Sequence, residues 1–185
     1  KRLKENNKSC FGLLDCGSNG DCLFHVISEA LNSKLILENK DPIYDYQILR
    51  NIASNEINDD NFEYILDSYK CEKQNNEFMG DWDPFEIDSI NDLREEINKC
   101  GDNFWGDHIL LQLIQKKLDF NTIIFSSNYL FDEFKILPLS NPNLNNNKKT
   151  ILIHYLDMVH FQLIGYFDGN KMTTLFDYNN IPNIV

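Results

Sequence analysis

Apolar side chains recur at the three- and four-residue spacing of an amphipathic helix in several stretches of the chain. The clearest stripe begins at Cys22 and runs to about Leu35, directly after the turn-forming run 17–21 (GSNGD). Asp21 stands at the expected N-cap, where a carboxylate can accept a free backbone N–H. The remaining stretches predict one or two helices between Pro42 and about Tyr69, a short helix over Ile87–Ile97, and a strong helix over Ile109–Leu118.

The second half of the chain changes to short β-branched runs, which are typical of strands. The predicted strands are Asn121–Phe125, Thr150–Tyr155, His160–Phe167 and a final edge strand over Met172–Phe176. Asp168-Gly169-Asn170 predicts a tight turn, and the polar run Asn141–Lys149 predicts an exposed loop. Helices first and strands later indicate an α+β domain rather than a regular βαβ array.

With 185 residues, 42% of them hydrophobic, the chain is long enough for one domain, 1–185, with one core. Its 29 acidic and 17 basic residues give a net charge of −12, which argues against nucleic acid as the main partner and favours a basic protein or peptide. No apolar run approaches the roughly 20 residues of a bilayer-spanning helix. The first five residues contain neither Met nor a signal-peptide stretch, so we expect a piece of a longer protein.

The cysteine count favours free thiols in a reducing, intracellular setting. The five cysteines are odd in number and form no CxxC motif, and a chain of this length needs no disulfide framework. The four histidines form no zinc-type spacing with any cysteine pair, so we expect neither a metal nor another cofactor.

Cys22 is the candidate nucleophile. At the start of a helix its thiol would feel the positive end of the helix dipole and free backbone N–H groups, which favours the thiolate. The same N–H groups could face a developing oxyanion, and Gly20 allows the tight turn that aims them. The alternative interpretation is a cysteine that only fills the core.

His160 is the candidate general base. It opens a predicted strand on which His160 and Gln162 share one face, so that face would border a cleft. The Gln162 amide oxygen could accept Nδ1–H of His160 and leave Nε2 to take the thiol proton; a half-buried histidine with satisfied hydrogen bonds is the alternative. His25 has no evident orienting partner, His108 is expected in solvent and His154 in the sheet, so all three are weaker candidates.

Three blocks of residues, taken together, resemble the ovarian-tumour (OTU) family of cysteine proteases. They are Asn19–His25, the Trp105-Gly106 turn before a helix and the strand Ile123–Phe125, and the His160-Phe161 strand, spread in the family's order over about residues 14–167. The resemblance implies a papain-like OTU fold, with a small mixed β-sheet flanked by helical lobes. It implies Cys22 as nucleophile, His160 as base and the backbone N–H groups of Asn19, Gly20, Asp21 and Cys22 as oxyanion hole, with Trp105 and Gly106 beside the substrate channel; a packing role for the indole is the alternative.

Two departures from the family pattern affect this site. Asn19-Gly20-Asp21-Cys22 exchanges the acid and the amide of the usual Asp-Gly-Asn-Cys, so we expect backbone donors to survive in a less preorganised loop. Gln162 stands where the family has Asp or Asn, and a neutral amide stabilises imidazolium less than a carboxylate does. The candidates for the third catalytic residue are therefore Gln162 first and Asp157 second, with Asp168 and Asp15 also open.

The resemblance implies a deubiquitinase that hydrolyses isopeptide bonds after the C-terminal Gly-Gly of ubiquitin or polyubiquitin through a thioester. An acidic surface would attract the basic ubiquitin tail, and the helices between Pro42 and Ile97 would contact ubiquitin. We expect a cytoplasmic location, in the host if the source is a parasite, symbiont or virus. The alternatives are an impaired OTU-fold ubiquitin-binding module, a thiol protease for another ubiquitin-like modifier, and another thiol acyl-transfer enzyme such as a glutamine amidase.

Overall fold

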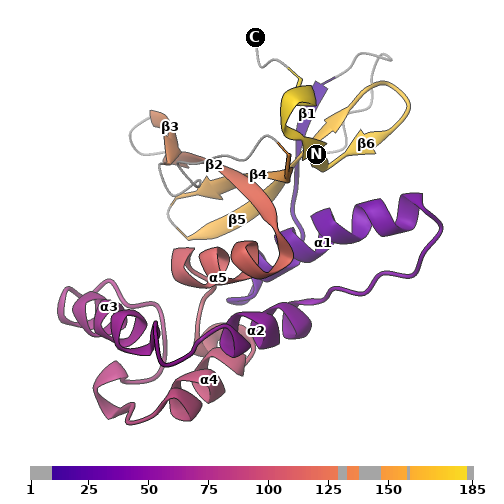
Figure 1. Ribbon diagram of the computed structural model, residues 1–185. Helices are drawn as coiled ribbons and strands as arrows, with labels where there is room; N and C mark the ends of the chain where they lie inside the picture. Colours follow the sequence, from indigo (N-terminus) through magenta and orange to yellow (C-terminus); the bar gives the residue numbers. More distant parts are fainter. Residues whose placement is uncertain (1–9, 129–132, 138–146, 158, 183–185) are drawn as a thin grey trace.

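The computed structural model describes residues 10–128, 133–137, 147–157 and 159–182. A β-sheet lies on one side of the molecule, α1 and α5 lie next to it, and α2, α3 and α4 form a helical lobe beyond them (Figure 1). The helices are α1 (Cys22–Leu37), α2 (Tyr46–Asn55), α3 (Phe62–Gln74), α4 (Ile90–Asn98) and α5 (His108–Leu118). All the predicted helices are confirmed, and the stretch that starts at Pro42 holds two of them.

The described strands form one mixed sheet. They are β1 (Cys10–Leu14), β2 (Phe120–Asn128), β3 (Glu133–Leu137), β4 (Lys149–Leu156), β5 (His160–Phe167), β6 (Met172–Thr173) and β7 (Leu175–Asp177). The main order is β1-β5-β4-β2-β3, with β6 paired to β5 and β7 to β4. Only β2 and β4 run parallel among these pairs. A separate helical lobe and a mostly antiparallel sheet confirm the predicted α+β class.

Three details of the strand prediction change. The apolar pattern of the sequence predicts neither β1 nor β3. The expected final strand is divided into β6 and β7 at Thr174, a buried residue whose hydroxyl donates to Ser33 Oγ of α1 at 3.0 Å. Of the predicted loop, residues 141–146 lie outside the described residues, and Lys149 already belongs to β4.

The main core lies between the sheet and the helices. Phe161 and Leu163 of β5 pack in one buried cluster with Leu23 and Phe24 of α1. The alternate β5 residues Ile164 and Tyr166 pack in a smaller, separate cluster with Phe125, Leu152 and Phe176. His160 and Gln162 follow the same alternation, so they share one face of β5 as predicted.

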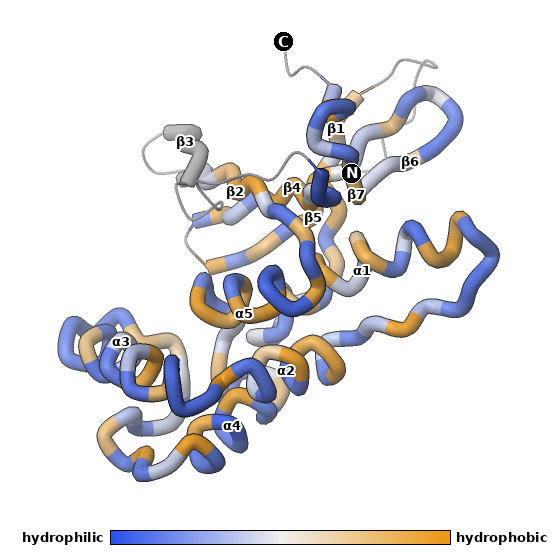
Figure 2. Tube along the Cα trace, viewed as in Figure 1, coloured by the Kyte–Doolittle hydropathy of each residue, from blue (hydrophilic) through white to orange (hydrophobic). Residues whose placement is uncertain are grey.

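Figure 2 shows how hydropathy follows this arrangement: apolar positions line α5 and the adjoining strands, and the turns around α3 are mostly polar. Within the described part of the chain, no helix combines the length and the apolar character needed to cross a bilayer.

Helix α5 begins at a partly buried acidic cap. Asp107 accepts the N–H of Leu110 at 2.8 Å, whereas its Oδ2 is buried and has no hydrogen-bond partner among the described residues. The Tyr69 hydroxyl lies nearby, and burial raises the pKa of Asp107 to about 6. Since this value exceeds that of an unfolded aspartate, about 3.9, the contribution of Asp107 to stability is greatest at low pH and is lost as the pH rises through 4 to 6.

Asp107→Asn should therefore stabilise the protein at neutral pH, because an amide keeps the helix cap and removes the cost of ionisation. We expect the free energy of unfolding at pH 7.5 to rise by about 2 to 3 kcal/mol, with no gain at pH 3.5. Urea unfolding at the two pH values measures the difference. Asp45→Asn is the matched control, because Asp45 caps α2 through Ile48 N–H from an exposed position. An equal effect of Asp107→Asn at both pH values would contradict the assignment.

Candidate active site

The Cys22 thiol lies at the point where the first turn of α1 meets β5. Its residue is 5% exposed, and the backbone N–H groups of Phe161, Leu23 and Cys22 lie near enough to the sulfur to lower the pKa of the thiol. The β1–β5 ladder ends at the pair Leu14–Leu163, and beyond that end the N–H of Phe161 faces the thiol. The fold thus brings Cys22 beside the residue that follows His160.

Burial decides the protonation of this thiol. The three N–H donors lower the pKa of Cys22, but desolvation raises it by more, and the nearby Asp21 carboxylate raises it further. The net direction is upward from the ordinary value of a cysteine. The expectation that the helix start favours the thiolate is therefore wrong for the free protein, since the donors act as expected and burial outweighs them.

The side-chain partner of His160 is Asp15. Nε2 of His160 lies 3.2 Å from Oδ1 of Asp15, with the imidazole 24% and the carboxylate 67% exposed. Asp15 directly follows the last residue of β1, so the pairing of β1 with β5 places it at this end of the sheet. Because Nε2 of His160 contacts Asp15, Nδ1 is the ring nitrogen that remains to accept the thiol proton. The sequence predicts the opposite, with Nδ1 bonded to the orienting residue and Nε2 as the base.

Gln162, the first candidate for orienting His160, has a different partner. Its Oε1 lies 3.0 Å from Nδ1 of His154, and Nε2 of His154 lies 2.6 Å from the Ser127 hydroxyl. His154 is directly opposite Gln162 in the β4–β5 register. Directly opposed side chains are about 5 Å apart at Cβ, closer than residues i and i+2 along one strand, so the cross-strand pair forms instead. The prediction that Gln162 orients His160 is corrected accordingly.

The other two candidate carboxylates, Asp168 and Asp157, lie in the turns at opposite ends of β5. Asp168 follows the far end of β5, where its Oδ1 accepts the N–H groups of Asn170 and Lys171 at 2.8 Å. Asp157 lies in the β4–β5 turn with φ 50°, and its N–H donates to Ser127 O at 2.9 Å. Of the four candidates, Asp15 places a carboxylate oxygen within hydrogen-bond distance of His160.

The loop before Cys22 is held tightly against the helical lobe. Asn19 and Gly20 have φ of 65° and 77°, and a Cβ on Gly20 would lie 2.1 Å from the Gly101 carbonyl oxygen. The Gly20 carbonyl accepts the N–H of Gly106 at 3.2 Å. Within the described residues, the N–H groups of Asn19, Gly20 and Asp21 donate to no protein acceptor. The role of these N–H groups as an oxyanion hole stays a prediction.

The Trp105-Gly106 turn supports this loop. Besides its bond to Gly20, Gly106 packs so closely on α1 that a Cβ would lie 2.9 Å from Leu23 Cβ. Trp105 is half-buried and donates its backbone N–H to Met79 O at 3.1 Å. The other histidines have structural neighbours: His25 contacts the Tyr46 ring at 5.1 Å between centroids, and His108 opens α5.

Comparison with known proteins rests on structure alone: no protein-family model matches the sequence, and no curated protein matches it. An OTU domain solved in complex with ubiquitin is 16% identical, with a TM-score of 0.51 over 94% of this chain and 78% of that one. An OTU deubiquitinase from Wolbachia pipientis wMel is 13% identical, with a TM-score of 0.52 over 93% and 91%. The viral OTU domain protease from Taggert virus is 15% identical, with a TM-score of 0.50 over 88% and 83%. The chain has the OTU fold.

Within the OTU fold of this chain, the acid before Cys22 has a role that sequence did not reveal. Asp21 makes no side-chain cap of α1, contrary to expectation. Its carboxylate instead accepts bonds from Arg50 and from the N–H of Gly101. The loop is therefore braced rather than less ordered. A signal existed in the sequence, because Arg50 interrupts the apolar face formed by Leu49 and Ala53.

Small neutral alkylating agents should modify Cys71 before Cys22. Cys71 is exposed, whereas Cys22 is buried with a raised pKa, and only the thiolate reacts. With iodoacetamide at pH 7.5 we expect Cys22 to react at least about tenfold more slowly, and its rate to rise up to at least pH 9. Peptide mass spectrometry over time measures both rates, and a Cys22 that reacts first at pH 7.5 would refute the protonation state derived above.

Proposed function

We propose that this protein is a cysteine-type deubiquitinase that hydrolyses isopeptide bonds after the C-terminal Gly-Gly of ubiquitin. The observation that carries the proposal is that the fold packs Cys22, at the start of α1, against Phe161 at the start of β5, next to His160, whose Nε2 is bonded to Asp15. The substrate class is supported by the OTU structures compared above, one of which is in complex with ubiquitin.

In the acylation step, Cys22 is the nucleophile and His160 the base. As Sγ attacks the scissile carbonyl carbon, the thiol proton passes to Nδ1 of His160, and the Asp15 carboxylate stabilises the resulting imidazolium through Nε2–H. The carbonyl oxygen gains the negative charge and accepts the unused N–H groups of the Asn19–Asp21 loop. Collapse of this intermediate breaks the C–N bond, and His160 returns the proton to the departing lysine amine.

In the deacylation step, water replaces the amine. The water oxygen attacks the thioester while His160 takes one proton from the water. The oxyanion again accepts hydrogen bonds from the loop N–H groups. Breaking the C–S bond releases the ubiquitin carboxylate, and the proton on His160 restores the Cys22 thiol. The net charge of −12 favours encounter with the basic ubiquitin tail.

Ubiquitin with a C-terminal electrophile should label Cys22 covalently. Cys22→Ala should abolish labelling and lower turnover of a ubiquitin amide by several orders of magnitude, with the thermal unfolding midpoint retained. Cys16→Ala is the control for loss of a neighbouring thiol. Intact mass and a panel of ubiquitin-like modifiers report the result. Ubiquitin binding without turnover would instead indicate a binding module, and labelling by another modifier alone would indicate a different protease.

Asp15→Ala should lower kcat/KM by about 10- to 100-fold, because the imidazolium loses its carboxylate partner. A loss of about 10⁴, as for a buried triad acid, is not expected at so exposed a site. Gln162→Ala should have a smaller effect, since Gln162 faces His154. Fluorogenic ubiquitin hydrolysis from pH 5.5 to 9.5 compares the variants, and a larger loss with Gln162→Ala would restore Gln162 as the orienting residue.

A further inference from the structure

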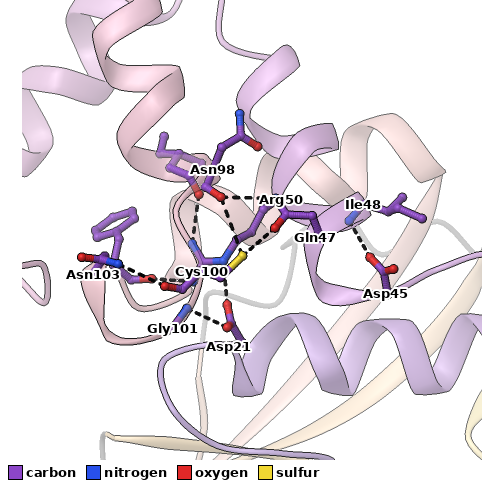
Figure 3. A network of polar contacts seen from close by, with 11 residues as sticks. Asp21, Asp45, Gln47, Ile48, Arg50, Asn98, Cys100, Gly101 and Asn103 are labelled. Carbon is purple, nitrogen blue, oxygen red and sulfur yellow. Dashed lines mark hydrogen bonds and ion pairs between the residues drawn. The ribbon is translucent and has the colours of Figure 1, made fainter.

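A buried ion pair includes the residue that precedes the candidate nucleophile, Cys22. Arg50 of α2 is 0% exposed and Asp21 is 6% exposed, and Nε of Arg50 lies 2.6 Å from Oδ1 of Asp21. Figure 3 shows the pair between the start of α1 and the turn that contains Cys100 and Gly101. Asp21 adjoins Cys22 in sequence, so any shift of this carboxylate is passed to the backbone at the thiol.

Arg50 uses its remaining donors to join separate segments of the helical lobe. Nη1 donates to Ile97 O at 3.0 Å, at the end of α4, and Nη2 donates to Phe104 O at 2.6 Å, just before the Trp105-Gly106 turn. The guanidinium also lies 4.4 Å from the centroid of the Phe24 ring in α1. The planar, forked donor set of arginine makes this possible, and lysine, with a single point charge, cannot reproduce it.

The second oxygen of Asp21 completes the bracing. Oδ2 accepts the N–H of Gly101 at 2.7 Å, so both carboxylate oxygens are bonded. The backbone of the same loop is fixed from its other side by the Gly106-to-Gly20 bond. The Asp21 side chain and the Gly20 carbonyl thus hold the loop through separate bonds. Within the described residues, the N–H groups of Asn19, Gly20 and Asp21 donate to no protein acceptor.

We propose that Arg50 is a positioning residue for the reaction: through Asp21 it fixes the loop whose N–H groups receive the oxyanion. This inference rests on the proposed function. It also gives a reason for an acid directly before Cys22, because a neutral amide there would leave the Arg50 charge buried and unpaired.

The test separates steps that form an oxyanion from steps that do not. Turnover of a ubiquitin C-terminal aminocoumarin amide passes through a tetrahedral oxyanion. Labelling by ubiquitin with a C-terminal 2-bromoethylamide does not, because Sγ displaces bromide in one step and the thiol proton goes to the base. The ratio of the two rate constants therefore reports on the oxyanion donors and is insensitive to ubiquitin affinity and to thiol reactivity.

We expect Arg50→Met to lower this ratio at least about tenfold, with the KM for the amide little changed. Arg50→Lys should lower it less. If Arg50→Met does not fold, Asp21→Asn combined with Arg50→Met removes both charges, and it should recover the unfolding midpoint while the ratio stays low. Arg94→Met is the matched control: Arg94 of α4 donates to Ile57 O within the same lobe and does not contact the loop.

Each outcome decides a separate question. An unchanged ratio in Arg50→Met or in the double variant, or an equal fall in Arg94→Met, would overturn the positioning role while leaving the protease assignment intact. Failure of the wild-type protein to react with either ubiquitin reagent would instead overturn the proposed function.

Discussion

The pairing of Asp21 with Arg50 is the constraint on which the site depends. Removing one member of a buried ion pair costs about 3 to 5 kcal/mol, whereas replacing both by apolar groups is often neutral or stabilising. Such a pair is therefore a poor way to gain stability. Its value lies in geometry: one guanidinium connects α1, α2, α4 and the turn before Trp105, and the carboxylate, which belongs to the residue before Cys22, also holds Gly101. We infer that the pair is kept for the shape of the loop rather than for the free energy of unfolding.

The spacing of apolar residues was sufficient to predict those helices and strands whose apolar face is formed entirely by their own residues. α1, α5, β4 and β5 all satisfy this condition, because each buries a regular set of side chains against the main core. β1 does not, since its five residues include a glycine and an exposed Leu13, and it is a strand through its pairing with β5. The predicted single last strand failed for a related reason: Thr174 is buried against α1 through Ser33, a tertiary contact that local propensity does not contain.

The same distinction separates the site residues that sequence could identify from those that it could not. Cys22 and His160 follow from local context, a helix start and a strand start. The partner of His160 depends on register, because β1 ends where it brings Asp15 to the ring and β4 places His154 opposite Gln162. Spacing along one strand cannot reveal either pairing. The bracing of Asp21 required knowledge that α2 packs its interrupted apolar face onto the start of α1.

In the proposed reaction, the raised pKa of Cys22 and the exposure of Asp15 together define when the charge on His160 is formed. In the proposed reaction, a thiol that is neutral in the free protein passes its proton to His160 during the attack instead of before it. An Asp15 carboxylate that is 67% exposed interacts weakly with the imidazole while water screens it. If the proposed function holds, a ubiquitin tail lying over this rim would exclude that water and strengthen the His160–Asp15 attraction at the step that needs it. Activation by substrate, rather than a resting thiolate–imidazolium pair, follows from the burial of one partner and the exposure of the other.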